Sequence, residues 1–147
     1  MLYFEDFIVG KRRLLGSRTI TQDEILRFAR EFDPQPFHVD PQAAAASIFG
    51  GLIASGWHTC AIVMRAMCDG YLLDAASLGS PGVDEIRWFK PVRPGDTLSI
   101  YTTVVEARPS KSKPDRGVVV SETEAANAAG DVLMRMRGMG MFLRKPA

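Results

Sequence analysis

Residues Trp57–Leu73 read WHTCAIVMRAMCDGYLL, and this stretch decides the fold. Only Arg65 is charged before Asp69, so apolar side chains surround almost the whole helix that we expect here. A helix of that kind is normally buried. The glycine-containing segment FGGLIASG precedes it and ends at Gly56. We therefore expect one long helix in the interior of the protein.

Four segments rich in β-branched and aromatic residues follow this helix. They read VDEIRWFKPV (83–92), DTLSIYTTVVEAR (96–108), GVVVSETEAANAA (117–129) and DVLMRMRGMGMFL (131–143). Turn residues separate them, so we expect consecutive strands to pair antiparallel. A first strand near residues 11–19 brings the count to about five. One buried helix and one such sheet predict an α+β fold in which the sheet curls around the helix.

Two helix starts flank a short polar stretch that carries titratable side chains. Thr21 is followed three residues later by Glu24, which is a capping-box pattern, and Asp40 precedes Pro41 as a second cap. Between them lies FDPQPFHVD (32–40), where each proline fixes φ and lacks an N–H donor. We expect a stiffened loop that presents Asp33 and His38.

Composition limits the classes of function. The chain has 147 residues and a formal charge of +1, so we expect a single domain over residues 1–147. A net charge this close to zero gives the protein no general electrostatic reason to bind nucleic acid or an acidic membrane surface. No run approaches the length of a membrane span, and the first residues do not resemble a signal peptide. Cys60 and Cys68 lie too far apart on one helix for a disulfide, which favours a reducing cytoplasm.

The stretch DPQPFH (33–38) resembles the Asp-x-Asn-Pro-x-His signature of the MaoC-like (R)-specific enoyl-CoA hydratases. The similarity continues through VDPQAAAASIFGGLIASG (39–56) and returns at RWFKPVRPGDTL (87–98). This resemblance implies the hotdog fold and the addition of water to an enoyl thioester. Asp33 and His38 would then form the catalytic pair, and the Gly56 N–H would bind the thioester oxygen.

The same resemblance suggests residues that contact the substrate and the partners that the protein needs. The substrate would be an acyl-CoA or acyl-carrier thioester with no further cofactor. We expect no metal, because no cysteine or histidine lies near the methionines of the last strand in the sequence. Hotdog hydratases of this length pair as homodimers or higher homo-oligomers. The residues expected to bind substrate are Gln35, Phe37, Ser55, Trp57, Lys90 and Arg93, the last two as partners for coenzyme A phosphates.

Several positions have a structural interpretation beside the functional one. We expect His58 to be a buried histidine with its polar atoms satisfied, and the methionines of the last strand to fill the core. Lys111, Lys113 and Arg116 belong to a solvated hairpin turn or contact coenzyme A phosphates. The segment LLDAASLGSP (72–81) is expected to shape the acyl end of the pocket.

Two other functions stay open. A hotdog thioesterase needs a carboxylate on or near the central helix, and residues 56–68 contain none. A non-catalytic acyl-binding or partner subunit is the second alternative. It is motivated by Gln35 and Ser55, which stand where the family usually has asparagine and histidine. A fold alone does not decide among these functions.

Overall fold

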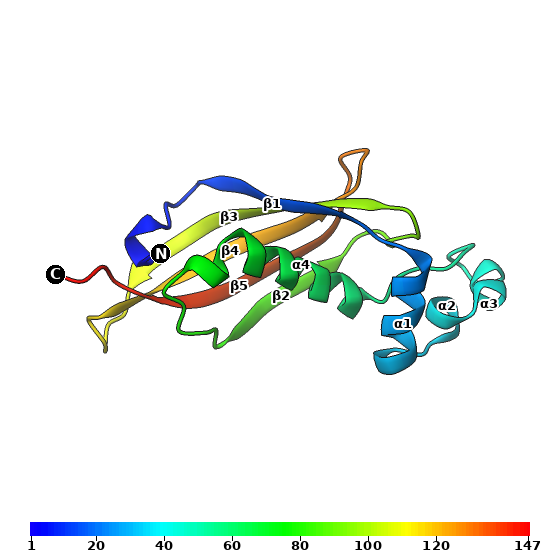
Figure 1. Ribbon diagram of the computed structural model, residues 1–147, viewed down its shortest axis with the longest axis horizontal. Coiled ribbons are helices and arrows are strands. Elements are labelled where there is room, and N and C mark those ends of the chain that lie inside the picture. Colours follow the sequence, from blue (N-terminus) through cyan, green and yellow to red (C-terminus); the bar gives the residue numbers. More distant parts are fainter.

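The computed structural model describes all 147 residues and shows one antiparallel sheet with a long helix against one of its faces (Figure 1). The helix is α4 (Gly56–Gly70). The strands are β1 (Arg12–Thr19), β2 (Gly82–Trp88), β3 (Thr97–Pro109), β4 (Arg116–Ala126) and β5 (Val132–Leu143). Their order in the sheet is β1-β3-β4-β5-β2. The α+β hotdog arrangement expected from the sequence is therefore confirmed.

The expectation of consecutive strand pairing is wrong for β2. The hairpins β3–β4 and β4–β5 form as expected, but β2 pairs with β5, from Gly82 opposite Met139 to Trp88 opposite Met134. The link from β2 to β3 contains Pro91 and Pro94, and it crosses to the other side of the sheet instead of forming a tight turn. As a result β1 and β2 are the two edges of the sheet.

Helix α4 is buried on one face only, which corrects the expectation of a helix buried all round. Its inner face packs on the sheet through Ile62 and Val63. Beside this buried face, Trp57 is 59% exposed and Met64 is 45% exposed. Apolar side chains on the remaining circumference therefore stay accessible in the isolated chain.

Three short helices lie beyond the N-terminus of α4 (Figure 1). They are α1 (Gln22–Phe32), α2 (Pro36–Val39) and α3 (Pro41–Ala45). The capping box of Thr21 and Glu24 is confirmed, and the Asp40 carboxylate accepts hydrogen bonds from the first N–H groups of α3. His38 lies on a helical turn and not in a loop, because Pro36 occupies the first helical position, where no N–H is needed. Two single-turn 3₁₀ helices, η1 (Phe4–Asp6) and η2 (Leu72–Asp74), complete the chain.

Candidate active site

Asp33 and His38 converge at the N-terminus of α4. Asp33 ends α1, where its N–H donates to the Ala29 carbonyl at 2.8 Å. Proline at position 36 then starts α2 at once, and His38 faces back toward the end of α1. The distance from His38 Nε2 to Asp33 Oδ2 is 3.3 Å, and both side chains are largely shielded from solvent. The structure therefore brings together the two titratable groups that the sequence singled out.

Two further donors hold the Asp33 carboxylate. Gln35 Nε2 donates to Oδ1 at 2.7 Å, and Ser55 Oγ donates to Oδ2 at 2.7 Å. Burial acts to raise the pKa of Asp33, but the hydrogen bonds from Gln35 and Ser55 and the charge of His38 outweigh it, so the pKa lies below its ordinary value. Both oxygens thus have fixed partners, and the ionised form is favoured.

His38 is oriented by a backbone carbonyl. Its side chain is buried, and Nδ1 lies 2.8 Å from the carbonyl oxygen of Ile53. A carbonyl oxygen only accepts hydrogen bonds, so Nδ1 carries a proton. Nε2, which faces Asp33, is then the nitrogen that can gain or lose a proton. Phe37 packs edge-on against the imidazole, with 4.6 Å between the ring centroids.

Ser55 belongs to the support of the site and does not face its opening. The side chain is fully buried, and its Oγ accepts from the Trp57 N–H at 3.3 Å while it donates to Asp33. One hydroxyl therefore caps α4 and fixes Asp33, and Ser55 is not among the residues that line the cleft. The result is a fixed link between the end of α1 and the start of α4.

Gly56 begins α4, so its N–H has no acceptor within the helix and lies at the positive end of the helix dipole. The Trp88 side chain packs against the α-carbon of Gly56. A Cβ on Gly56 would lie 2.5 Å from Trp88 Cε2, and Trp88 Nε1 donates to the Gly56 carbonyl at 3.1 Å. Sequence reasoning missed Trp88, because only the pairing of β2 with β5 brings it there.

A cleft of about 400 Å³ opens over these groups. Of the residues expected at the site, those that line it are Asp33, Gln35, Phe37, His38, Gly56, Trp57 and Lys90. Lys90 is half-exposed at the wall, with Nζ 3.2 Å from Asp131 Oδ2. Arg93 does not line the cleft. Its guanidinium donates to the carbonyl of Phe49, a lining residue, at 2.6 Å, so Arg93 supports the wall.

Other residues singled out in the sequence lie outside the cleft. His58 is buried, but its Nδ1 has no hydrogen-bond partner, so the expected satisfied histidine is not found. Its ring stacks on Phe28 with 4.7 Å between centroids, and burial lowers its pKa. The β3–β4 hairpin, which carries Lys111 and Lys113, lies at the end of the sheet opposite the cleft (Figure 1).

Both cysteines are free, in agreement with the sequence. No helix combines the length and the apolar character that crossing a membrane requires. No group of three or more His, Cys, Asp or Glu side chains lies close enough together to hold a metal ion.

Comparison with known proteins identifies related chains. The model of the family described as "MaoC like domain" matches residues 6–126. The crystal structure of a MaoC-like dehydratase from Rhodospirillum rubrum superposes with a TM-score of 0.92 at 43% identity and covers 100% of both chains. The 3-hydroxyacyl-thioester dehydratase Z of Mycobacterium tuberculosis is 36% identical over 89 residues, which are 59% of this chain and 59% of that protein. A Mycobacterium tuberculosis protein with a double hotdog fold, RV0216, has a TM-score of 0.86 at 16% identity over 99% of this chain and 45% of its own, which shows the fold alone.

Proposed function

The chain belongs to the MaoC-like domain family, and from this premise we propose that it hydrates trans-2-enoyl thioesters of coenzyme A or an acyl carrier to (3R)-hydroxyacyl thioesters, or catalyses the reverse dehydration. The observation that carries the proposal is the pair formed by Asp33 and His38 beside the free N-terminus of α4. The dehydratases among its relatives support the class of reaction. The (3R) product follows from the resemblance to (R)-specific hydratases.

The geometry provides the three groups that hydration needs. A water held between Asp33 and His38 loses a proton to one of them while its oxygen bonds to the β-carbon of the substrate. The electron pair of the double bond moves toward the thioester carbonyl, where charge develops on oxygen. The other member of the pair gives a proton to the α-carbon. One proton enters the pair and one leaves, and transfer of a proton between Asp33 and His38, which lie 3.3 Å apart, restores the starting state.

Backbone at the start of α4 stabilises the charge on the thioester oxygen. The Gly56 N–H and the helix dipole both favour negative charge there. Because the Trp88 indole covers the α-carbon of Gly56, a thioester would approach along the N–H side of the residue. Acid, base and hydrogen-bond donor all come from the protein, so the proposed reaction uses no cofactor beyond the thioester carrier.

The hydrogen bonds that hold the Asp33 carboxylate favour hydration over the two alternative functions. A non-catalytic subunit has no need to hold a carboxylate with its pKa lowered, yet Gln35 and Ser55 do so from two directions. A hotdog thioesterase normally uses a carboxylate carried by the central helix to direct water at the thioester carbonyl. On α4 the one acidic residue, Asp69, lies at the far end in an exposed ion pair with Arg65.

We further propose one MaoC-like domain over residues 1–147, acting as a homodimer in the cytoplasm. The free thiols support a reducing compartment. Exposed apolar side chains gather at the edge strand β2 and just after it, where Val83 is 49% and Phe89 is 48% exposed. Pairing of this edge with a second copy would cover them and satisfy the open strand. Lys90 and Arg93 would then meet coenzyme A phosphates near that interface.

Hydration of crotonyl-CoA, followed as loss of the conjugated thioester absorbance, tests the function. Asp33→Asn and His38→Ala should each lower the rate by roughly 10²-fold or more, the usual scale of acid–base assistance. Asp69→Asn, which removes an exposed carboxylate at the far end of α4, should leave the rate unchanged. Thermal unfolding of all three variants confirms that they are folded. Near wild-type turnover in a folded Asp33→Asn or His38→Ala variant would remove the assignment.

A further inference from the structure

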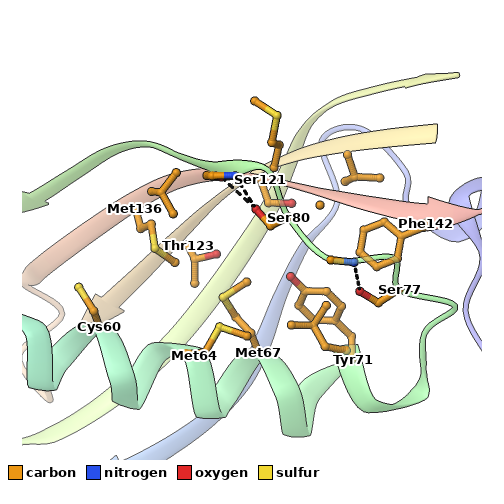
Figure 2. Close-up of a pocket in the computed structure, with 18 of the residues that line it drawn as sticks. Cys60, Met64, Met67, Tyr71, Ser77, Ser80, Ser121, Thr123, Met136 and Phe142 are labelled. Atoms are coloured by element: carbon orange, nitrogen blue, oxygen red, sulfur yellow. Dashed lines mark hydrogen bonds between the residues drawn. The ribbon is translucent and has the colours of Figure 1, made fainter. Parts of the chain in front are cut away.

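His58 is a buried titratable residue that the proposed reaction does not use. It lies two residues after Gly56, in the first turn of α4, and it lines neither the cleft nor a second cavity of about 430 Å³ between α4 and the sheet. Figure 2 shows Met64 and Met67, which line the second cavity, pointing from α4 toward the strands. Met67 follows His58 by about two and a half helical turns, so the two side chains leave opposite sides of the helix. The role of His58 therefore depends on what it packs against.

The His58 ring joins α4 to α1. It stacks on Phe28 with 4.7 Å between the ring centroids and 8° between the ring planes. Phe28 belongs to the second half of α1, which ends at Phe32 and is followed at once by Asp33. Asp33 in turn accepts the hydrogen bond from Ser55 Oγ at the start of α4. The stack and this hydrogen bond thus connect the same two helices, and the stack holds the helix that carries Asp33.

The position of His58 favours an uncharged ring. Its Nδ1 is buried and has no hydrogen-bond partner. A neutral ring can leave this nitrogen as a bare acceptor, but a protonated ring carries an N–H on both nitrogens, so Nδ1 would become a buried donor without an acceptor. Such a donor is unfavourable, and more so when it is charged. The positive end of the helix dipole also disfavours a cation in the first turn of α4.

The charged groups near His58 do not reverse this preference. Burial is the largest influence on the pKa of His58 and lowers it, while Glu24 of α1 raises the pKa and Arg18 of β1 lowers it. The Glu24 carboxylate is already engaged, because it pairs with the Arg18 guanidinium and accepts hydrogen bonds from the N–H and the hydroxyl of Thr21. The pKa of His58 therefore lies below its ordinary value, and the packed ring is neutral at pH 7 and above.

Acid should loosen this contact. When the His58 ring leaves the stack for water, its pKa returns to about 6.5, the ordinary value for histidine. A histidine whose pKa is lower in the packed state stabilises that state above the ordinary pKa, and this contribution is lost as the pH falls from there through the lowered pKa. Ile25 is fully buried in the core, so the first half of α1 stays anchored. The loss is therefore expected in the last turn of α1, beside Asp33.

We propose that His58 is a positioning residue, whose neutral ring holds the end of α1 and thereby keeps Asp33 beside His38, and that protonation of His58 in mildly acidic solution reversibly displaces Asp33 and slows the reaction. This inference rests on the proposed hydratase function, to which it adds control by pH. Protonation of Asp33 itself does not account for a loss between about pH 6.5 and pH 5, because the pKa of that carboxyl lies below an ordinary value of about 3.9.

The pH dependence of crotonyl-CoA hydration in two variants tests the proposal. His58→Phe keeps an aromatic ring for the stack and removes the titrating group, so it should retain most of the wild-type kcat at pH 7.5. Between pH 7.5 and pH 5 the wild type should lose about tenfold more of its kcat than His58→Phe does, which corresponds to ~1.4 kcal/mol. His58→Gln has neither the ring nor the charge, so its kcat should be low at pH 7.5 without the extra loss in acid. Equal losses in acid for the wild type and both variants would overturn the proposal.

A substitution on α1 tests the stack from its other side. Phe28→Leu should lower kcat at pH 7.5, because the end of α1 is then held as poorly as in the protonated wild type. Phe32→Leu is the matched control one turn further along α1, since Phe32 is 65% exposed and packs on Phe28. This control should keep the wild-type rate and pH profile. A Phe28→Leu variant with the wild-type rate and pH profile would contradict the role of the stack.

Two measurements follow the switch without relying on activity. The chain has two histidines, so comparison of NMR spectra of the wild type and His58→Phe assigns the His58 ring signal, which should titrate below pH 6.5. Hydrogen exchange read by mass spectrometry gives the protection of residues 28–35. After correction for intrinsic exchange, that protection should fall between pH 7.5 and pH 5 by about tenfold more in the wild type than in His58→Phe, while the strand β4 stays protected in both. Return to pH 7.5 should restore protection.

These measurements separate this inference from the hydratase assignment. If no enoyl-CoA is hydrated at any pH but the end of α1 loses protection in acid only in the wild type, the switch stands and the hydratase proposal fails. If crotonyl-CoA is hydrated while protection and kcat fall equally in the wild type and His58→Phe, the hydratase proposal stands and this inference is overturned. A His58 signal that titrates at or above pH 6.5 would overturn it as well.

Discussion

Replacement of Ser55 by alanine should slow the proposed hydration most strongly at acidic pH. Ser55 Oγ donates to Asp33 Oδ2 at 2.7 Å from a fully buried position, so no solvent replaces it when it is removed. Hydrogen bonds to charged groups contribute about 1.5–3 kcal/mol. Loss of that amount from the ionised form shifts the balance toward the protonated acid by roughly 10- to 150-fold.

The sign of the pH effect follows from the direction of the shift. In the wild type the hydrogen bonds keep the pKa of Asp33 low, so the carboxylate persists into acidic solution. Without Ser55 its pKa rises, and the carboxylate is lost at a higher pH than in the wild type. The acidic limb of the kcat/KM profile for crotonyl-CoA should therefore move to higher pH. At alkaline pH both proteins hold the carboxylate ionised, and their rates should approach each other.

Ser55 also caps α4, so its loss affects stability as well as the carboxylate. Thr21→Ala is the matched control, because Thr21 caps α1 through the Glu24 N–H and does not contact Asp33. Both variants should lose about 1 kcal/mol of unfolding free energy. Only Ser55→Ala should move the pH profile. An identical acidic limb in the wild type and a folded Ser55→Ala variant would refute this account of how Asp33 is held.

Two further predictions concern packing and assembly. Gly56→Ala places a methyl group against the Trp88 indole and should destabilise the fold by about 1–3 kcal/mol in thermal unfolding. The Gly56→Ala/Trp88→Ala double variant should recover this loss. A Gly56→Ala variant as stable as the wild type would contradict the contact. Light scattering should give a mass of at least twice the 16.2 kDa of one chain. Val83→Glu on the β2 edge should shift the measured mass toward that of the monomer. A monodisperse wild type at the mass of one chain would exclude the dimer.

Local signals in the sequence predicted most of the elements, and long-range pairing explains the main error. The capping pattern of Thr21, the apolar run of α4 and the alternation of the later strands act over a few residues, so each could be read directly. The place of β2 beside β5 depends on contacts between segments about fifty residues apart. No turn residue in the sequence indicates that β2 pairs with β5. Pro91 and Pro94, which follow β2, indicated only that the strand ends.

The candidate site was also only partly predictable from the sequence. The resemblance identified Asp33 and His38, and the structure brings them within 3.3 Å. Their partners were not predictable from spacing, because Ser55 and the Ile53 carbonyl reach them from another segment of the chain.

The protein has two tryptophans, and both lie at the candidate site. Trp57 and Trp88 meet edge to face with 5.5 Å between ring centroids, and Trp88 covers Gly56. Trp57 lines both the cleft and the second cavity between α4 and the sheet. All indole fluorescence of the folded chain therefore originates beside the two cavities. A thioester that displaces either ring changes the environment of half of the emitting groups, so intrinsic emission can report ligand binding in real time without a label or a coupled reaction.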